Sequence, residues 1–458
     1  MIKTNNLPTP PTLWKTIGPS FILLGLALGS GELILWPYLA ARYGLGLLWG
    51  AAVGVLFQFV LNTEAMRYTL YQGESVFAGF RKLHKWLPIW FIFSTFIPFA
   101  IPGFSSAAAN IVAQLIPGIS ETAVAVGLLL LTGVLLTVGK SLYKTMEHLQ
   151  KTIIFLGLPL IVILTFWLTS LHDWSQVARG LIGIGEGWNF FPPAVAITAF
   201  LSAFAYAGAG GNLNLAQSYY IKEKGFGMGR YMDKISSLFG KSKKSYEFFG
   251  HSFADTKLNR RRWQAWWQLV NREHLIVFFS LGLITIVLLS LLAYTTVFGS
   301  HQQVVEGISF IYLQAQIINQ QTIPFFGTAF LVMATLMLFG TQVGVMESSA
   351  RIISENMALF KLKPNEQINL SKWFYASLWG QIILGIIIYS FGIKEPRFLI
   401  TLSAILNAAA MMLSFVFVSM LNKRYLRPWY RSGKLRQTIM GTAVLFFLYF
   451  LVLTILER

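Results

Sequence analysis

The sequence predicts an all-α polytopic membrane protein with about eleven transmembrane helices, built as two five-helix repeats of opposite orientation. Three observations support this fold class: the composition, the length of the apolar runs, and a pair of matching interruptions within two of those runs. Of the 458 residues, 55% are hydrophobic and only 12% are charged, whereas soluble domains carry about 25% charged residues. This balance is typical of a chain that crosses a bilayer many times.

Eleven apolar segments are long enough to span a membrane, which takes about 20 residues of helix. They cover residues 18–41, 46–72, 88–115, 121–139, 151–171, 191–221, 273–298, 323–350, 372–392, 397–421 and 437–456. We divide the chain into a cytoplasmic tail (1–17), a first repeat (18–171), a second repeat (191–421) and a last helix (437–458). The second repeat contains a long basic loop at 222–272.

The positions of Lys and Arg predict the orientation, because cytoplasmic loops of membrane proteins are enriched in basic residues. Thirty of the 36 Lys and Arg residues fall in the N-terminal tail or in the segments that follow the even-numbered helices. We therefore expect an integral protein of the inner or plasma membrane, with a cytoplasmic N-terminus and an external C-terminus. The tail is polar, so we expect no cleaved signal peptide.

The net charge of +18 comes from these loops, so it does not indicate nucleic-acid binding. The chain has no cysteine, which rules out disulfides and thiolate metal sites. No nucleophile, base and orienting group occur in a catalytic pattern, and we expect no enzyme activity and no resident cofactor. We expect a monomer.

The loop at 222–272 combines three consecutive arginines, Arg260 to Arg262, with three tryptophans at helical spacing, Trp263, Trp266 and Trp267. Basic residues and tryptophans on one helix are typical of a segment that lies on an anionic membrane surface. We therefore predict that this helix lies on the inner leaflet. All six histidines, including His274, fall in or beside predicted loops, so none is expected to act as a proton shuttle in the middle of the membrane.

The first helix is interrupted at its centre by Leu28-Gly29-Ser30-Gly31-Glu32, and Pro37 follows one turn later. Glycine weakens a helix by about 1 kcal/mol relative to alanine. A carboxylate within the membrane is costly and by default indicates function. Close helix packing would explain the glycines but would not explain Glu32. The pattern favours a broken helix that exposes backbone groups to a cargo.

The sixth helix is interrupted in the same way, over Phe204 to Asn214, with three glycines and two asparagines. Matching interruptions in two halves of a chain are the best sequence indication of a transporter's midplane binding site. The two interruptions lie in the first and sixth helices, so the repeat is five helices long. Because five is an odd number, the halves are predicted to be inverted relative to each other.

Residues Gly18 to Trp49, together with Asn212-Leu213, resemble the Nramp (SLC11-type) metal-ion transporters. The resemblance implies the leucine-transporter-type fold and the transport of a divalent metal, usually coupled to protons. The helix 1 signature of that family, Asp-Pro-Gly-Asn, falls on Gly29-Ser30-Gly31-Glu32. Its helix 6 signature, Met-Pro-His-Asn-Leu, falls on residues 209–213, where Ala209 replaces the methionine ligand. A thioether selects soft metals, so the family's selectivity for manganese, iron or cadmium does not simply carry over.

These departures favour a second interpretation. Gly-Ser-Gly in helix 1, with Phe-Ala-Tyr-Ala-Gly in helix 6, resembles the binding motif of the amino acid–polyamine–organocation transporters. That resemblance implies that backbone N–H groups bind the carboxylate of a substrate. Glu32 would then accept a proton or bind the substrate amine.

Several polar or flexible positions are candidates for the site. We expect Glu32, Asn212 and Asn214 to supply metal ligands. Glu64 and Arg67, three residues apart on helix 2, are expected to pair, either as a structural ion pair near the cytoplasmic end or as a coupling or gating element. The candidate substrate-binding residues are Gly29, Ser30, Gly31, Glu32, Ala207, Gly208, Ala209, Gly210, Gly211, Asn212, Asn214 and Asn407.

The expected function is secondary-active transport by alternating access. The first hypothesis is a hard divalent cation such as Mg²⁺ or Mn²⁺, with H⁺ or Na⁺ as the coupling ion. The second is an amino acid or another small carboxylate bound at Gly29-Ser30-Gly31. The third is a scaffold or sensor without transport, whose working part is the basic loop.

Overall fold

A computed structural model describes residues 5–139, 141–193, 195–235, 246–298, 308–362, 368–392 and 396–456. Within these ranges the chain is helical, with no strand and a single isolated bridge between Ile184 and Asn189. The predicted all-α fold class is therefore confirmed.

Ten helices of the described chain are long and apolar enough to cross a membrane. They are Pro19–Tyr43 (α2, η1 and α3), Leu45–Gln72 (η2 and α4), Leu87–Leu115 (α6 and α7), Glu121–Val138 (α8), Leu142–Leu168 (α9), Lys257–Thr296 (α13, η5 and α14), Pro324–Lys361 (α16), Leu370–Ser390 (α17), Leu399–Tyr425 (within α18, Pro396–Tyr425) and Lys434–Leu456 (α19). The predicted helix at 191–221 is the one missing from this set. It forms two short pieces, α11 (Ile197–Ala205) and α12 (Gln217–Lys224), joined by a 3-10 turn, η3 (Gly211–Ala216).

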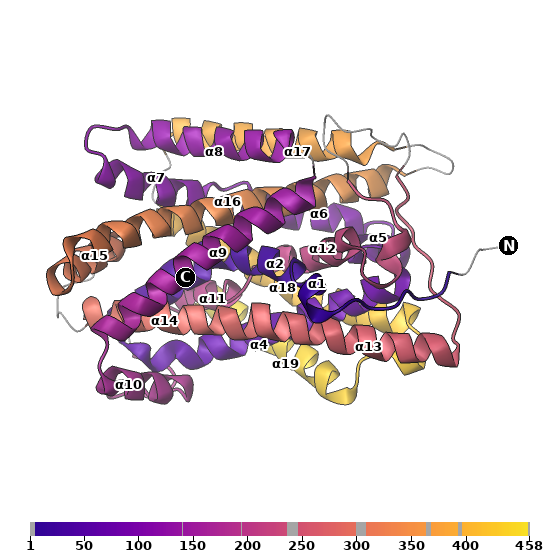
Figure 1. Cartoon of the computed structure of the whole chain (residues 1–458), viewed down its shortest axis with the longest axis horizontal. Helices are drawn as coiled ribbons and strands as arrows, with labels where there is room; N and C mark the ends of the chain where they lie inside the picture. The colour runs from indigo at the N-terminus through magenta and orange to yellow at the C-terminus, as the bar shows by residue number, and fades with distance from the viewer. Residues whose placement is uncertain are drawn as a thin grey trace.

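The helix Pro19–Tyr43 lies at the centre of the bundle, with every residue of its most apolar window buried. The 38-residue helix α16 crosses the molecule beside it and also packs against α6, α7, α9 and α17. Helices α8 and α17 lie side by side at one edge of the bundle (Figure 1). Helix α19 packs against α18 and α4. The predicted interruptions therefore lie in the best-shielded part of the fold.

Some helices are longer than predicted because they include polar turns outside the apolar segments. Helix α9 begins at Leu142 and not at 151, because the Ser141 hydroxyl accepts a hydrogen bond from Lys144 N and caps the helix. Such a cap satisfies one of the free N–H groups at a helix start. Shorter helices that the sequence analysis did not predict are α1 (Leu13–Thr16), α5 (Val76–Leu83), α10 (Leu171–Leu181) and α15 (Ser309–Gln321).

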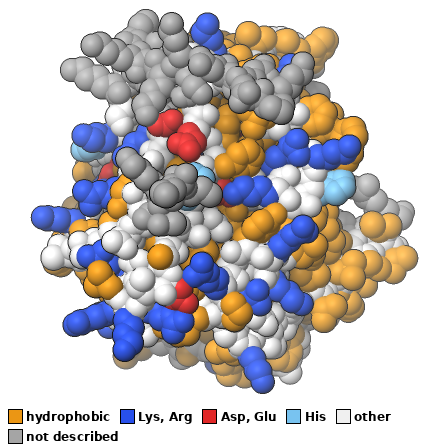
Figure 2. All heavy atoms as spheres, turned by 90° about the vertical axis from the view of Figure 1, so that its right-hand side faces the viewer, with side chains coloured by type: hydrophobic (Ala, Val, Ile, Leu, Met, Phe, Trp, Pro, Cys, Tyr) orange, Lys and Arg blue, Asp and Glu red, His pale blue; other side chains and the backbone are white. Residues whose placement is uncertain are grey.

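The end of the molecule that carries the N-terminus is strongly basic. Figure 2 faces this end and shows many Lys and Arg side chains with few carboxylates. The exposed basic residues described in the segments that follow the even-numbered predicted helices are Lys85, Lys144, Arg230, Lys234, Lys257, Arg260, Arg261, Arg272, Lys361, Lys372, Lys423, Arg424, Arg427 and Lys434.

The predicted surface helix in the basic loop is not a separate element. Helix α13 (Lys257–His274) continues directly through η5 (Leu275–Leu281) into α14 (Gly282–Thr296), and the three lie in one line (Figure 1). Trp263 and Trp266 are buried in the protein and do not face outwards. The prediction of a helix lying on the inner leaflet is wrong because these tryptophans find protein partners.

Those partners come from the N-terminal segment and from α4 (Leu48–Gln72), the second predicted helix. Trp266 Nε1 donates to Pro8 O at 2.7 Å, and Asn259 Oδ1 accepts from Leu7 N at 3.2 Å. The Trp263 ring packs edge-on against Tyr71. Just before α13, hydrogen bonds from the Arg260 guanidinium lower the pKa of the Asp255 carboxyl well below its usual range. Helix α13 is therefore held along its length by the rest of the chain.

Replacing Trp266 with alanine should lower the free energy of unfolding by about 3–5 kcal/mol, as truncation of a buried tryptophan usually does. Thermal unfolding of purified protein in lipid-free detergent measures the loss. Trp14→Ala is the matched control, since the Trp14 side chain is 83% exposed. Equal melting temperatures for wild type and Trp266→Ala would show that protein contacts do not hold α13.

Candidate functional site

The interruption in the first helix is a change of helix type and not an unwound segment. Residues Leu28–Leu35 form a π-helix, η1, between α2 (Pro19–Ala27) and α3 (Trp36–Tyr43). The α-helical pattern is broken where predicted, but the chain stays helical. The expectation that Gly29 to Gly31 expose a stretch of free backbone is therefore wrong. Single π-helical turns within α-helices are common at functional sites.

The change begins where a threonine from α16 enters the backbone ladder of helix 1. Gly29 N donates to Thr341 Oγ1 at 2.9 Å, and Thr341 Oγ1 donates to Gly25 O at 2.8 Å. An α-helix would instead join Gly29 N directly to Gly25 O. Insertion of a side chain into this ladder is a known cause of local helix distortion. The Thr341 hydroxyl fits here because Gly29 has no side chain. A Cβ on Gly29 would lie only 2.9 Å from Thr341 Oγ1.

Gly31 brings helix 1 into backbone contact with the interruption of helix 6. A Cβ built on Gly31 would lie 1.7 Å from Tyr206 O, so no other residue fits without a backbone shift. The two interrupted segments therefore touch, as the sequence predicts. Ser30 is buried beside this contact, and its hydroxyl donates to Ala27 O at 3.2 Å.

The interruption in helix 6 is a true break. Helix α11 ends at Ala205, the chain turns through Tyr206 to Gly210, and Gly210 and Gly211 adopt positive φ angles of 79° and 50°. Glycine adopts this region without the steric cost that other residues incur. The predicted helix break at residues 208–211 is confirmed.

Gln58, at the centre of α4, satisfies backbone groups that the break releases. Its amide nitrogen Nε2 donates to Ala205 O at 3.2 Å, and its Oε1 accepts from Gly210 N at 3.3 Å. Gly208 lies against the same side chain, where a Cβ would come within 2.6 Å of Gln58 Oε1. The neighbouring Ala207 and Ala209 are buried. Gln58 was not among the predicted site residues, although a glutamine at the centre of an apolar span is a signal that could have identified it.

The polar residues of the break are held by α6 (Leu87–Phe99) and α18. Asn212 Nδ2 donates to Ser94 Oγ and Thr95 Oγ1 at 2.8 and 2.9 Å, and Asn212 Oδ1 accepts from Ser414 at 3.1 Å. Both functional ends of the Asn212 amide are therefore engaged within the protein.

Two other predicted residues keep an oxygen without a partner. Asn407 Nδ2 donates to the Tyr206 hydroxyl at 3.0 Å, and Asn214 Nδ2 donates to Gly211 O at 3.3 Å. The Oδ1 atoms of Asn214 and Asn407 are buried and have no hydrogen-bond partner among the described residues. A buried polar group without a partner is costly, so each of these oxygens is available to a ligand.

Glu32 is fully buried, and both of its carboxylate oxygens lack a hydrogen-bond partner in the described chain. The side chain extends towards α14, because a Cβ on Gly282 would lie 3.5 Å from Glu32 Oε1. Asn212, by contrast, faces α6 and α18. In this conformation Glu32 and Asn212 therefore face different neighbours and form no joint site.

A further unpartnered amide lies on the same face of α4 as Gln58. Asn62 follows Gln58 by one turn and precedes Met66 by one turn, and residues four apart share a helix face. Gln58 contacts Gly210, while Met66 Sδ accepts from Gln217 Nε2 at 3.5 Å. Asn62 therefore lies alongside the segment between these two contacts. The amide atoms of Asn62 and the Oε1 atom of Gln217 are buried and have no hydrogen-bond partner in the described ranges.

The arrangement offers one carboxylate and several amide oxygens on the helices that meet at the break. Hard cations such as Mg²⁺ and Ca²⁺ are bound by such oxygen ligands. Within the described residues no group of three His, Cys, Asp or Glu side chains could hold a metal ion. A cation at this place would depend on Glu32, neutral oxygens and retained water.

Glu64 and Arg67 form the predicted ion pair, but in a different part of the molecule. Arg67 Nε donates to Glu64 Oε2 at 2.9 Å, and the guanidinium stacks on the Trp267 ring at 3.7 Å. Arg436 and Asn422 also donate to the Glu64 carboxylate, at 3.4 and 3.1 Å. This network joins α4 to α13, α18 and α19. A role in coupling or gating stays a prediction.

The expectation that every histidine lies in or beside a loop is wrong for His274, which lies within a continuous helix. This residue is fully buried at the junction of α13 and η5, where its ring stacks on Phe278 with centroids 4.6 Å apart. His274 Nδ1 lies 2.7 Å from Ser20 Oγ, and Ser20 also bonds to the buried carboxylate of Glu273. The prediction failed because α13, η5 and α14 form one continuous helix. The end of the predicted loop, where His274 lies, is therefore part of a helix inside the bundle.

The fold is that of known membrane transporters. The chain is similar to the Eremococcus coleocola manganese transporter, a single-residue mutant of which has a TM-score of 0.70 at 14% identity, covering 98% of this chain and 88% of that one. The same transporter in complex with an aromatic bis-isothiourea substituted compound gives 0.68 at 15%, covering 99% and 90%.

A second likeness is to Mhp1, a nucleobase-cation-symport-1 family transporter, in a closed conformation with bromovinylhydantoin bound. Its TM-score is 0.50 at 10% identity, with 99% of this chain and 96% of that one covered. No protein-family profile and no curated protein matches the chain. The structural likenesses confirm the leucine-transporter-type fold that the sequence resemblance implied.

Replacing Thr341 with valine keeps the shape of the side chain but removes the hydroxyl between Gly25 O and Gly29 N. Two buried backbone groups then lose their shared partner, which should cost about 1–3 kcal/mol of stability. Thermal unfolding in detergent measures this cost. Thr341→Ser retains the hydroxyl and should stay close to wild type. A valine variant as stable as the serine variant would show that the bridge does not shape helix 1.

Replacing Gly31 with alanine should separate the two interrupted helices, because the new methyl group overlaps Tyr206 O. Overpacking of this kind costs about 1–3 kcal/mol or more, read as a lower melting temperature. Gly127→Ala in α8 is the control, since nothing lies within 4 Å of a Cβ there. It should be neutral or stabilising by up to about 1 kcal/mol. Equal behaviour of the two variants would contradict the close contact.

Proposed function

We propose that this protein is a secondary-active transporter that works by alternating access and carries a hard divalent cation, with Mg²⁺ or Mn²⁺ as the simplest candidates. The observation that carries the proposal is Glu32, a fully buried carboxylate that has no hydrogen-bond partner among the described residues and lies next to the contact between two interrupted helices. An isolated charge in a dry interior is strongly unfavourable. A cargo cation or a proton would relieve this cost.

The ligand chemistry favours a hard cation over a soft one. The oxygens near the break come from Glu32 and from amides, and Ala209 stands where the resembling family has a thioether. Mg²⁺ usually keeps several waters and is held by one or two carboxylates, so a site with one glutamate is chemically sufficient. For alternating access, Glu32 and the oxygens of Asn214 and Asn407 would have to come together in another conformation. H⁺ or Na⁺ is the proposed coupling ion, with Glu32 as the proton acceptor.

The competing cargo, a small carboxylate on the backbone of Gly29 to Gly31, receives less support. Gly29 N already donates to Thr341 Oγ1, and Gly31 is covered by Tyr206 O. A substrate carboxylate would have to displace both contacts, and it would also meet the charge of Glu32. The same geometry gives no support to a scaffold without transport, which needs no buried carboxylate.

We further propose that the basic end faces the cytoplasm, so that the N-terminus is cytoplasmic and the C-terminus external. The gathering of Lys and Arg at one end of the bundle supports this orientation (Figure 2), since cytoplasmic loops are enriched in these residues. The protein would work as a monomer in the inner or plasma membrane.

Replacing Glu32 with glutamine tests the cargo, because it keeps the shape and deletes the charge. For a cation cargo, loss of one partner of a buried charge pair should weaken binding by roughly 30-fold or more. For a carboxylate cargo, affinity should stay unchanged or improve. Uptake into proteoliposomes, measured with Mg²⁺, Mn²⁺ and a panel of amino acids, separates the two.

Glu186→Gln is the control for that measurement, since Glu186 is exposed and bonds only to Tyr294 among the described residues. It should transport as wild type does. Undiminished cation uptake by Glu32→Gln would exclude Glu32 as the cation ligand and with it the proposed cargo.

A further inference from the structure

A cavity of about 680 Å³ lies between α18, α19 and α4, away from the helix 1–helix 6 contact. Its lining residues come mainly from the C-terminal half of α18 and the first turns of α19. Met420, Lys423 and Leu445 at its rim are exposed, so the cavity is open to the surroundings of the bundle. Within a bilayer those surroundings include lipid.

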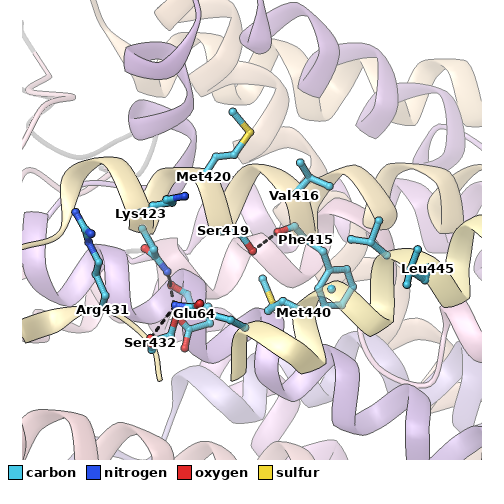
Figure 3. A pocket seen from close by; sticks show the side chains of 14 residues that line it. Glu64, Phe415, Val416, Ser419, Met420, Lys423, Arg431, Ser432, Met440 and Leu445 are labelled. Atoms are coloured by element: carbon cyan, nitrogen blue, oxygen red, sulfur yellow. Dashed lines mark hydrogen bonds between the residues drawn. The ribbon is translucent and has the colours of Figure 1, made fainter. Parts of the chain in front are cut away.

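The lining is divided into an apolar part and a polar part, which Figure 3 shows at opposite ends. The apolar part consists of Phe415, Val416, Met440, Val444 and Leu445. The polar part consists of Glu64, Asn422, Lys423, Arg431, Ser432 and Gln437. Along α18, Phe415 and Lys423 are eight residues apart, or about 12 Å. An occupant must therefore be amphiphilic over at least that length.

The apolar part contains a gap beside α19. Nothing lies within 4 Å of a Cβ built on Gly441, which lines the cavity. The gap is bordered by the side chains of Met440, Val444 and Leu445, so it suits a hydrocarbon chain. It also permits a larger side chain at Gly441 without a clash.

The polar part is positively charged. Arg431 Nε donates to Leu426 O at 2.8 Å, while its two terminal nitrogens have no partner in the described residues. Lys423 Nζ likewise has no hydrogen bond or ion pair within the described ranges. Glu64 adds no net repulsion for an anion, because Arg67 and Arg436 both pair with its carboxylate.

An unpartnered acceptor lies at the floor of the polar part. Asn422 is 4% exposed, and its Nδ2 donates to the backbone oxygen of Glu64 at 3.0 Å. Its Oδ1 is buried and has no partner in the part of the chain that is described. This oxygen requires a donor, such as a hydroxyl group, from the occupant.

We propose that this cavity binds an anionic glycerophospholipid with a hydroxylated headgroup, of the phosphatidylglycerol type. The phosphate lies between Lys423 and Arg431, and charge-assisted hydrogen bonds of this kind are about twice as strong as neutral ones. A headgroup hydroxyl donates to Asn422 Oδ1, and one acyl chain follows the apolar part past Gly441. The lipid thereby joins α18 to α19 beside the Glu64–Arg67 ion pair.

Native mass spectrometry of the purified full chain tests the binding, with phosphatidylglycerol and phosphatidylcholine of identical acyl chains as probes. Wild type should retain phosphatidylglycerol in preference to phosphatidylcholine. The double variant Lys423→Gln/Arg431→Gln should bind phosphatidylglycerol roughly tenfold or more weakly, as expected for the loss of two charged donors. Arg424→Gln is the matched control, because Arg424 is exposed on the same helix turn but does not line the cavity.

Two further variants test the placement of the lipid. Gly441→Leu fills the gap, so it should reduce phosphatidylglycerol binding while its melting temperature without lipid stays at or above that of wild type. Asn422→Leu removes the acceptor and should reduce the preference for a hydroxylated headgroup over phosphatidic acid.

The proposal is overturned if wild type binds the two probe lipids equally, or if the double variant binds phosphatidylglycerol as tightly as Arg424→Gln does. Binding of glycerol phosphate as strong as that of the whole lipid would also overturn it, since the apolar part would then have no occupant. Transport activity is not needed for any of these measurements, so they are independent of the proposed cargo.

Discussion

The hydroxyl group of Thr341, set between Gly25 O and Gly29 N, is the contact on which the central geometry depends. The α-helical hydrogen bond from Gly29 N to Gly25 O is replaced by two hydrogen bonds that pass through the Thr341 hydroxyl of α16. The ladder then continues as a π-helix from Leu28 to Leu35, which changes the direction of every side chain in that stretch. Glu32 lies in the middle of it, and Gly31 meets the carbonyl group of Tyr206. The position of the carboxylate therefore follows from a threonine three hundred residues away.

The two interrupted helices solve the problem of buried backbone in different ways. In a membrane, polar backbone groups must find partners within the protein. Helix 1 changes to a π-helix over Leu28–Leu35, and the Thr341 hydroxyl is the hydrogen-bond partner of Gly29 N and Gly25 O. Helix 6 breaks, and Gln58 provides both a donor and an acceptor to the ends of the break. Among the described residues, the unpartnered groups near the two interruptions are side-chain atoms of Glu32 and of the amides Asn62, Asn214 and Asn407, which is why the candidate site consists of Glu32 and amides and not of free backbone.

The large features of the fold could be predicted from the sequence because they depend on local properties. Apolar length identified the spans, and the glycines and asparagines of residues 204–214 identified the break in helix 6. The form of the interruption in helix 1 could not be predicted, since it depends on Thr341, a contact between distant segments. The same reason explains the errors at Trp266 and His274. Their composition suggested a surface helix and a loop, but their environment is set by the N-terminal segment and by helix 2.

The uninterrupted rod formed by α13, η5 and α14 has a mechanical consequence. Its 40 residues correspond to about 60 Å at 1.5 Å per residue. Phe278, near its middle, touches Gly208 in the break of helix 6, while Trp266 further along holds Pro8 of the N-terminal segment. If this helix tilts as a rigid body about its middle, its ends move further than its middle does. A tilt of about 5° around Phe278 displaces the first residue of α13, about 30 Å away, by roughly 2.6 Å. A rigid tilt of this helix at its contact with the break of helix 6 would therefore also move the N-terminal segment that Trp266 binds at the basic end of the molecule.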